Sequence, residues 1–178
     1  MANKNVTCVG SVSGCVCDAF SELESLGSEA REIVDNASEN LAQTQRIQTF
    51  DETASTLENF SEPDVPGSVG DLPVSYTETQ NKRGVSRANR CGNAVAMLEG
   101  AKSACENWIG EQREIIDKLQ ERDDMETEEL EGLDDVEGAN DRTVDDIESE
   151  ISEVEQLISD IEDAVSEAEG CEFPGMYG

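Results

Sequence analysis

Six cysteines are the residues whose type and spacing could do chemistry here, because the chain contains no histidine. Cys8, Cys15 and Cys17 form a C-x6-C-x-C cluster near the N-terminus. Thiolates bind zinc and iron–sulfur clusters, but such sites usually need four ligands, and this cluster supplies three. We therefore expect no metal and no other cofactor. Instead, we interpret Cys8, Cys15 and Cys17 as candidates for disulfides between subunits.

Catalysis is not indicated by the remaining residues. General acid–base chemistry most often uses histidine, and a serine nucleophile needs a neighbouring base. Carboxylates are plentiful, with 42 acidic residues, so pairs of them arise by chance. They fall on the faces of predicted helices that would meet solvent, where burial cannot tune a pKa. We predict that the protein is not an enzyme and has no small-molecule substrate.

The composition favours helices that pair along narrow seams over a thick core. Hydrophobic residues make up 36% of the 178 residues and aromatic residues 4%, against about 45–50% apolar residues in typical domains. The net charge is −30. A seam between paired helices needs only two apolar positions in seven. The sequence therefore predicts an all-α fold of elongated coiled-coil segments.

The strongest pattern lies between residues 143 and 169, where apolar residues alternate three and four positions apart. Its members are Val144, Ile147, Ile151, Val154, Ile158, Ile161, Val165 and Ala168. A similar but softer seam runs through residues 85–122. Its members are Ala94, Leu98, Ala101, Cys105, Trp108, Gln112, Ile115 and Leu119. These patterns predict two long helices that pack against other helices.

An antiparallel helical hairpin over residues 85–169 would bring the two seams together. If Leu119 lies near Val144, Cys91 faces position 172 at the open end of the hairpin. Cys91 and Cys171 are then candidates for a disulfide, which needs Cα atoms within about 7 Å of each other. The same pairing would place Arg87 and Arg90 near the acidic end of the last helix.

The rest of the chain divides by composition into segments around this hairpin. Residues 1–17 are rich in Gly, Ser and Cys, and we interpret them as a non-helical attachment segment. The apolar spacing of residues 18–60 predicts one long helix, or two helices joined near residues 49–51. Gly27 is expected to leave a gap in the apolar seam of this segment. Residues 61–84 form a Pro/Gly linker with a short extended piece near residues 72–79. Residues 170–178 are interpreted as a docking tail.

Self-association is expected from the last helix. Ile and Val at both seam positions favour trimers over dimers, so we predict a homo-oligomer with a trimer favoured. The acidic surface repels nucleic acid and anionic membranes, and no stretch approaches the roughly 20 apolar residues of a membrane span. Other structural proteins are therefore the expected partners.

These observations lead to two functional hypotheses. The first is a non-enzymatic coiled-coil adaptor or accessory component of a larger particle, with a virus or phage virion as the setting: a fibre-base, neck, baseplate or capsid accessory part. The alternative is a cytoplasmic, acidic DNA mimic that inhibits a basic nucleic-acid-binding protein. Residues 123–178 carry 22 acidic residues and a single basic one, Arg142, which makes such a negative rod physically available.

Overall fold

The computed structural model describes residues 4–81, 84–123 and 142–174. Within these ranges the chain forms two strands and five helices. In order they are β1 (Lys4–Ser11), α1 (Val12–Asp35), α2 (Glu39–Ala42), α3 (Gln45–Leu57), β2 (Pro73–Gln80), α4 (Arg87–Asp123) and α5 (Val144–Glu169). None of the described helices combines the length and the apolar character that crossing a membrane requires.

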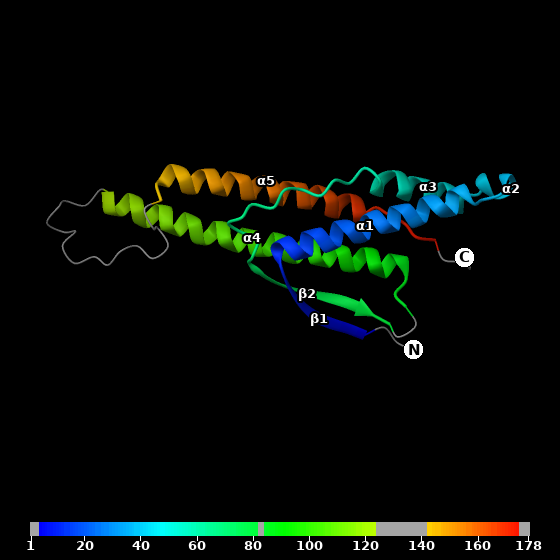
Figure 1. The fold of residues 1–178 in the computed structure, drawn as a ribbon, viewed down its shortest axis with the longest axis horizontal. Helices are drawn as coiled ribbons and strands as arrows, with labels where there is room; N and C mark the ends of the chain where they lie inside the picture. The colour runs from blue at the N-terminus through cyan, green and yellow to red at the C-terminus, as the bar shows by residue number, and fades with distance from the viewer. Residues whose placement is uncertain (1–3, 82–83, 124–141, 175–178) are drawn as a thin grey trace.

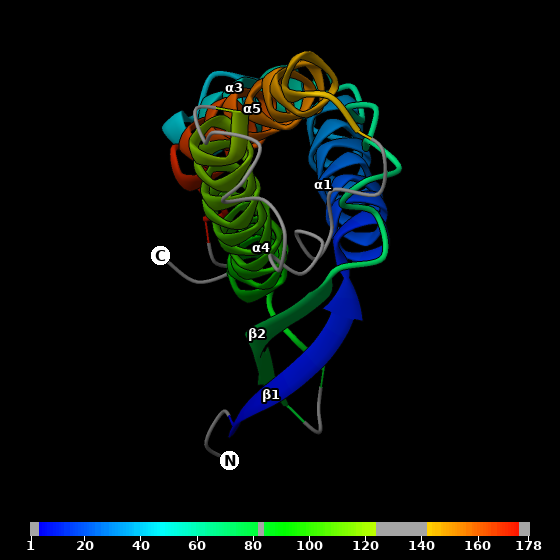
Figure 2. The ribbon, with the colours of Figure 1, turned by 90° about the vertical axis from the view of Figure 1, so that its left-hand side faces the viewer.

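The molecule is elongated, with its long helices running roughly along one axis (Figure 1). Helix α4 is central, because α1, α5 and β2 all pack against it. Helix α3 packs against α1. The view along the long axis places α5 on one side of the bundle and the two strands, as a projecting ribbon, on the opposite side (Figure 2).

The predicted all-α fold class is wrong, because β1 and β2 form a two-stranded antiparallel sheet. The extended piece expected near residues 72–79 is β2, but its partner was not foreseen. The two strands are separated in sequence by α1, α2 and α3, so no tight hairpin turn marks them as a pair. Alternation within residues 4–11 is the signal that was missed, since Val6 and Cys8 are half-buried while Thr7 and Val9 are exposed.

The prediction that the N-terminal segment is non-helical is also wrong, because α1 begins at Val12 and not near Asp18. Ser11 is the N-cap, and its hydroxyl oxygen accepts a hydrogen bond from the Gly14 amide at 3.1 Å. Val12, Cys15 and Val16 are buried and continue the apolar face of the helix toward its N-terminus. Their 3-4 spacing stabilises the first turns, which the Gly/Ser-rich composition had concealed.

The helical segment predicted for residues 18–60 divides earlier than expected, between Asp35 and Gln45, with the short α2 in the break. This division lets α3 fold back onto α1. A Cβ atom at Gly27 would lie 2.9 Å from the Leu57 Cβ. Gly27 is therefore a point of close helix contact and not a gap in the packing.

Helices α4 and α5 run antiparallel. Lys102 pairs with Glu162 at 2.5 Å, and Arg113 further along α4 pairs with Glu155 at 2.8 Å. Helix α5 starts with a capping box, in which Thr143 and Asp146 exchange side-chain and backbone hydrogen bonds, and it is capped by Gly170. The acidic connection at residues 124–141 lies outside the described residues.

The seam of α5 is buried inside this single chain. Ile147, Val154 and Ile161 have no exposed surface or almost none, whereas Ile158 and Val165 are only half-buried. Leu157 and Ala164 are buried beside them. The buried face is wider than a two-position coiled-coil seam because α5 packs against α3 as well as against α4. Ala164 also borders a hollow that is lined by Phe20, Asn59 and Phe60.

Candidate assembly surface

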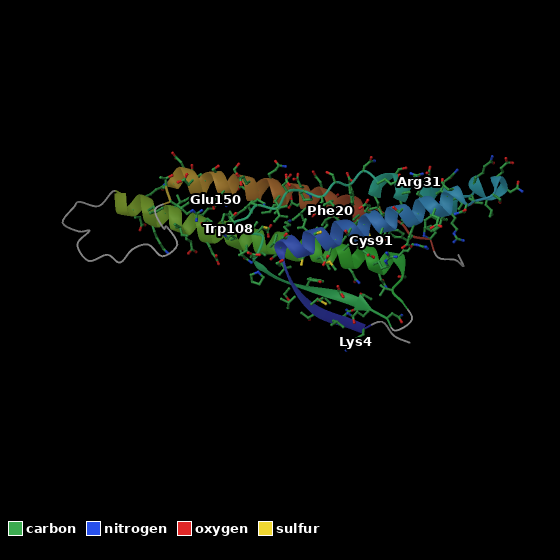
Figure 3. The ribbon with its side chains drawn as sticks, in the orientation of Figure 1. Lys4, Phe20, Arg31, Cys91, Trp108 and Glu150 are labelled. Atoms are coloured by element: carbon green, nitrogen blue, oxygen red, sulfur yellow. The ribbon has the colours of Figure 1, made fainter. Side chains whose placement is uncertain are left out.

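The ribbon of β1 and β2 projects from one side of the helical body (Figure 2). The pairing of β1 with β2 is continuous from Lys4↔Gln80 to Ser11↔Pro73, with one residue opposite one residue throughout. Figure 3 shows Lys4 at the far end of the ribbon, away from the helical body. Lys4 and Glu78 are the only charged residues in the two strands, so the ribbon is neutral in a chain of net charge −30.

One face of the ribbon is held against α4. Val74 is 2% exposed, and a Cβ atom at Gly100 would lie 2.8 Å from the Val74 Cγ1. The absence of a side chain at Gly100 is what allows β2 to approach the helix this closely. The ribbon is therefore fixed to the body through β2, while β1 contacts mainly β2.

The outer edge of β2 is closed by a side chain of α4. The Thr79 amide donates to the Asn93 Oδ1 at 2.8 Å, and the Asn93 Nδ2 donates to the Thr79 carbonyl at 3.2 Å. An asparagine side chain thus takes the place of a neighbouring strand. Both backbone groups of Thr79 consequently point away from β1.

This contact establishes which backbone groups of β1 point outward. Antiparallel pairs alternate between hydrogen-bonded and non-hydrogen-bonded, so Asn5, which is opposite Thr79, belongs to a non-hydrogen-bonded pair. The same holds for Thr7 and Val9. Two observations agree: Pro73, which has no amide hydrogen, falls in this class, and the Val12 amide, one register step later, donates to the Leu72 carbonyl at 3.1 Å.

No strand of the described residues pairs with the other edge of β1, which therefore presents the N–H and C=O groups of Asn5, Thr7 and Val9. The side chains of these three residues are exposed on the ribbon face that points away from α4, next to exposed Ser75 and Thr77 on β2. Val9 is 76% exposed, and the only other large hydrophobic side chain that is exposed in the described part of the chain is Leu41, at 55%. This face carries hydroxyl, amide and methyl groups and no charge.

The three N-terminal thiols differ in burial. Cys15 is buried beneath Gly10, Cys8 is half-buried on β1, and Cys17 is exposed on α1. Burial and the neighbouring Glu78 raise the pKa of Cys8, while the carboxylate of Glu62 is the main cause of the raised pKa of Cys17. No group of three or more potential ligands within the described ranges is arranged to hold a metal ion.

Cys91 and Cys171 lie at the same place in the bundle. The Cys91 Sγ is 3.4 Å from the Ala168 carbonyl oxygen, which also accepts the Cys171 amide at 3.1 Å. Burial raises the pKa of Cys91 to about 11. All six cysteines are free thiols in the structure, so the predicted disulfides stay predictions.

The remaining seam residues that the sequence singled out lie inside the helical body. On α4 the buried members are Leu98, Ala101, Cys105, Trp108 and Leu119, while Ile115 is half-buried. Burial raises the pKa of Cys105 to about 11. On α5 the half-buried Val144 begins the seam, and Ile151 is 7% exposed. These side chains therefore support the fold of the single chain, and their predicted role in an oligomer stays a prediction.

The basic residues at the start of α4 also serve the fold, with different partners from those expected. Arg87 pairs with Glu29 at 2.6 Å, and Arg90 bridges Glu22 and Glu29. Both acids lie on α1 and not on α5. These ion pairs fasten α1 to α4, and the guanidinium groups hold the pKa of Glu29 below its ordinary value of 4.5.

Comparisons with family models, curated proteins and solved structures found no match. Function must therefore be inferred from the geometry of this chain. Sequence reasoning missed the open edge of β1 and the role of Asn93. The alternating pattern of residues 4–11 was the available signal for the strand, whereas nothing in the sequence near Asn93 marks it as the residue that closes the edge of β2.

Proposed function

We propose that this protein is a non-enzymatic structural component of a larger assembly, in which the helical body acts as a spacer and the ribbon as the attachment end. The observation that carries the proposal is the contrast between an acid-covered body and a neutral ribbon with one open edge. An exposed strand edge is a ready template for pairing with another chain. The long helices, by comparison, bury their apolar seams within the chain.

The setting that we propose is a virus or phage particle, in which the chain is an accessory or adaptor part. The grounds are the elongated shape, the cysteine content and the lack of a recognisable catalytic constellation in the sequence. The partners would be other structural proteins and further copies of this chain. Neither nucleic acid nor membrane is proposed as a direct partner, because both are repelled by a surface of net charge −30.

The test is to tag the chain in its source, purify particles by sedimentation and quantify their proteins by mass spectrometry. An assembly component should sediment with the particle at a fixed ratio to its other proteins. That ratio should survive a wash in roughly 1 M salt, since backbone pairing at a strand edge does not depend on long-range charge. Recovery of the chain only in the unsedimented fraction would contradict the proposal.

An acidic DNA mimic remains the second candidate, and α5 is the observation that favours it. Glu148, Glu153 and Asp163 are exposed on this helix, and none of them forms an ion pair within the described ranges. Mimicry requires a rigid row of negative charges, which a capped helix of 26 residues provides. Titration of binding to a basic DNA-binding protein against salt separates the candidates, because a mimic's affinity should fall steeply as salt rises.

A further inference from the structure

Within the ranges that the structure describes, the edge of β1 lacks the features by which proteins prevent unwanted strand pairing. Natural edge strands are blocked by charged side chains, proline, bulges or a covering element. The pairing of β1 with β2 has no bulge, and its outward residues Asn5, Thr7 and Val9 include no charge and no proline. The other edge of the same ribbon does have such features, since Pro73 lies at one end of β2 and Asn93 covers Thr79.

We propose that a second copy of this chain pairs with this edge, β1 against β1, in antiparallel orientation about a twofold axis at Thr7. The resulting sheet has the order β2-β1-β1-β2. Thr7 lies opposite Thr7 of the second copy, and Asn5 lies opposite its Val9. The twofold axis adds the equivalent pair of Val9 with Asn5 of the second copy. These three pairs are the ones whose backbone groups point outward, so the dimer gains about six backbone hydrogen bonds.

The strand is complementary to itself in this register. The outward set is centred on Thr7, as a twofold axis requires, because such an interface uses the same patch on both copies. Directly opposed threonines are among the favourable cross-strand pairs. A two-stranded ribbon is only marginally stable, and the addition of strands strengthens it.

Charge favours a second copy over an unrelated basic strand. The only charged residue on β1 is Lys4, so the edge offers nothing to attract a basic segment. A basic partner would be drawn to α5, which lies on the far side of α4 from the ribbon (Figures 1 and 2). Two copies that meet at their ribbons keep their α5 helices apart, and repulsion beyond about 8 Å is largely screened at physiological salt.

This inference deepens the proposed function and rests on it, since it names the ribbon's first partner. The two can fail separately. A chain that is always monomeric in solution but sediments with a particle at a fixed ratio would overturn the self-pairing and leave the assembly role intact.

The first experiment measures the sedimentation of the full chain over a range of concentrations under reducing conditions, with native mass spectrometry in parallel. We expect a monomer–dimer equilibrium. Thr7→Pro removes an outward amide while sparing the bonds between β1 and β2, and should weaken the dimer by roughly tenfold or more, because one hydrogen bond is lost from each copy. Ser75→Pro is the matched control, since it removes an outward amide from the other edge of the ribbon, on β2, and should leave the dimer unchanged.

The second experiment tests the register independently of stability. In the proposed pairing Val6 lies opposite Cys8 of the second copy in a non-hydrogen-bonded pair, with Cα atoms about 4.5 Å apart, a distance that suits a disulfide. Val6→Cys should therefore give a covalent dimer with glutathione disulfide, which is reduced to two thiols as the protein disulfide forms. Val6→Cys combined with Cys8→Ser should give none.

The outcomes are decisive in either direction. Support for the pairing would be concentration-dependent dimers that Thr7→Pro weakens and that the Val6→Cys variant joins through a disulfide between position 6 of one copy and Cys8 of the other. A monomer at all concentrations overturns it, as does a dimer that Thr7→Pro leaves unchanged. A trimer held by the helices, or a stable complex of the ribbon with a different protein's strand in place of its own, would also overturn it.

Discussion

The ribbon and the helical body differ in how far their polar and apolar groups are paired or buried. In the body, apolar seams are buried within the chain, and basic residues such as Arg90 are paired with acids of a neighbouring helix. In the ribbon, Val9 is 76% exposed and a row of backbone groups on β1 has no neighbouring strand within the described part of the chain. The apolar seams of the body are thus covered by its own helices, whereas one edge of the ribbon is left without a neighbouring strand in the described part of the chain. This difference indicates where an acidic, elongated protein can make contact with a partner.

A charge placed in the buried seam should destabilise the helical body, whereas the same charge on the ribbon should not. Ile161 has no exposed surface, so Ile161→Asp buries a carboxylate without a partner and should destabilise the protein by about 4 kcal/mol or more. Val9→Asp places the same carboxylate in solvent and should change stability by less than about 0.5 kcal/mol, while weakening the dimer. Urea unfolding of both variants checks the contrast, and equal losses of stability would contradict it.

The attachment of the ribbon to the body can be weakened at a single glycine. In Gly100→Ala the new Cβ would lie 2.8 Å from the Val74 Cγ1, so α4 and β2 must move apart, at a cost of about 1–3 kcal/mol. Gly110→Ala on the same helix meets nothing within 4 Å and should stabilise the protein by roughly 0.5–1 kcal/mol. Thermal unfolding measures both changes. A stabilising Gly100→Ala would show that β2 does not lie against this residue.

The ion pairs between α1 and α4 give the smallest expected effect, a dependence of stability on pH. The pKa of Glu29 is lowered in the folded protein, so its stabilising contribution is present above 4.5 and is lost as the pH falls through the folded value. Glu29→Gln should reduce stability at neutral pH, and the difference from the unmodified protein should shrink below pH 4.5. Urea unfolding at a series of pH values tests this expectation, and Glu24→Gln is a suitable control. A difference that grows on acidification would contradict the assigned sign.

The helices were more accessible to sequence reasoning than the strands, and the reason is physical. Heptad spacing is a local signal, so the bounds of α4 and α5 are close to those expected from residues 85–122 and 143–169. The strand β1 depends on a partner more than sixty residues away, and no local pattern records that pairing. The start of α1 at Val12 was obscured because Gly and Ser in residues 10–14 resemble a loop.

The candidate surface was harder still to predict. A strand edge is open only if no other part of the chain covers it, which depends on the whole fold. The opposite edge is closed by the side-chain amide of Asn93, which α4 brings to Thr79. The cysteines are the residues whose type suggests chemistry, yet Cys15 and Cys105 are buried among apolar side chains. Burial, which sequence spacing predicts only for regular seams, decides which of these thiols a partner can reach.

We propose that the ribbon edge, and not the acidic helices, is the surface through which the protein associates. Amide hydrogen exchange of β1, followed by NMR at low and high protein concentration, locates that surface residue by residue. The amides of Asn5, Thr7 and Val9 should exchange rapidly when the protein is dilute and become protected as its concentration rises, while those of Val6 and Cys8 are protected throughout. Unchanged exchange at Thr7, or new protection confined to α5, would contradict the claim.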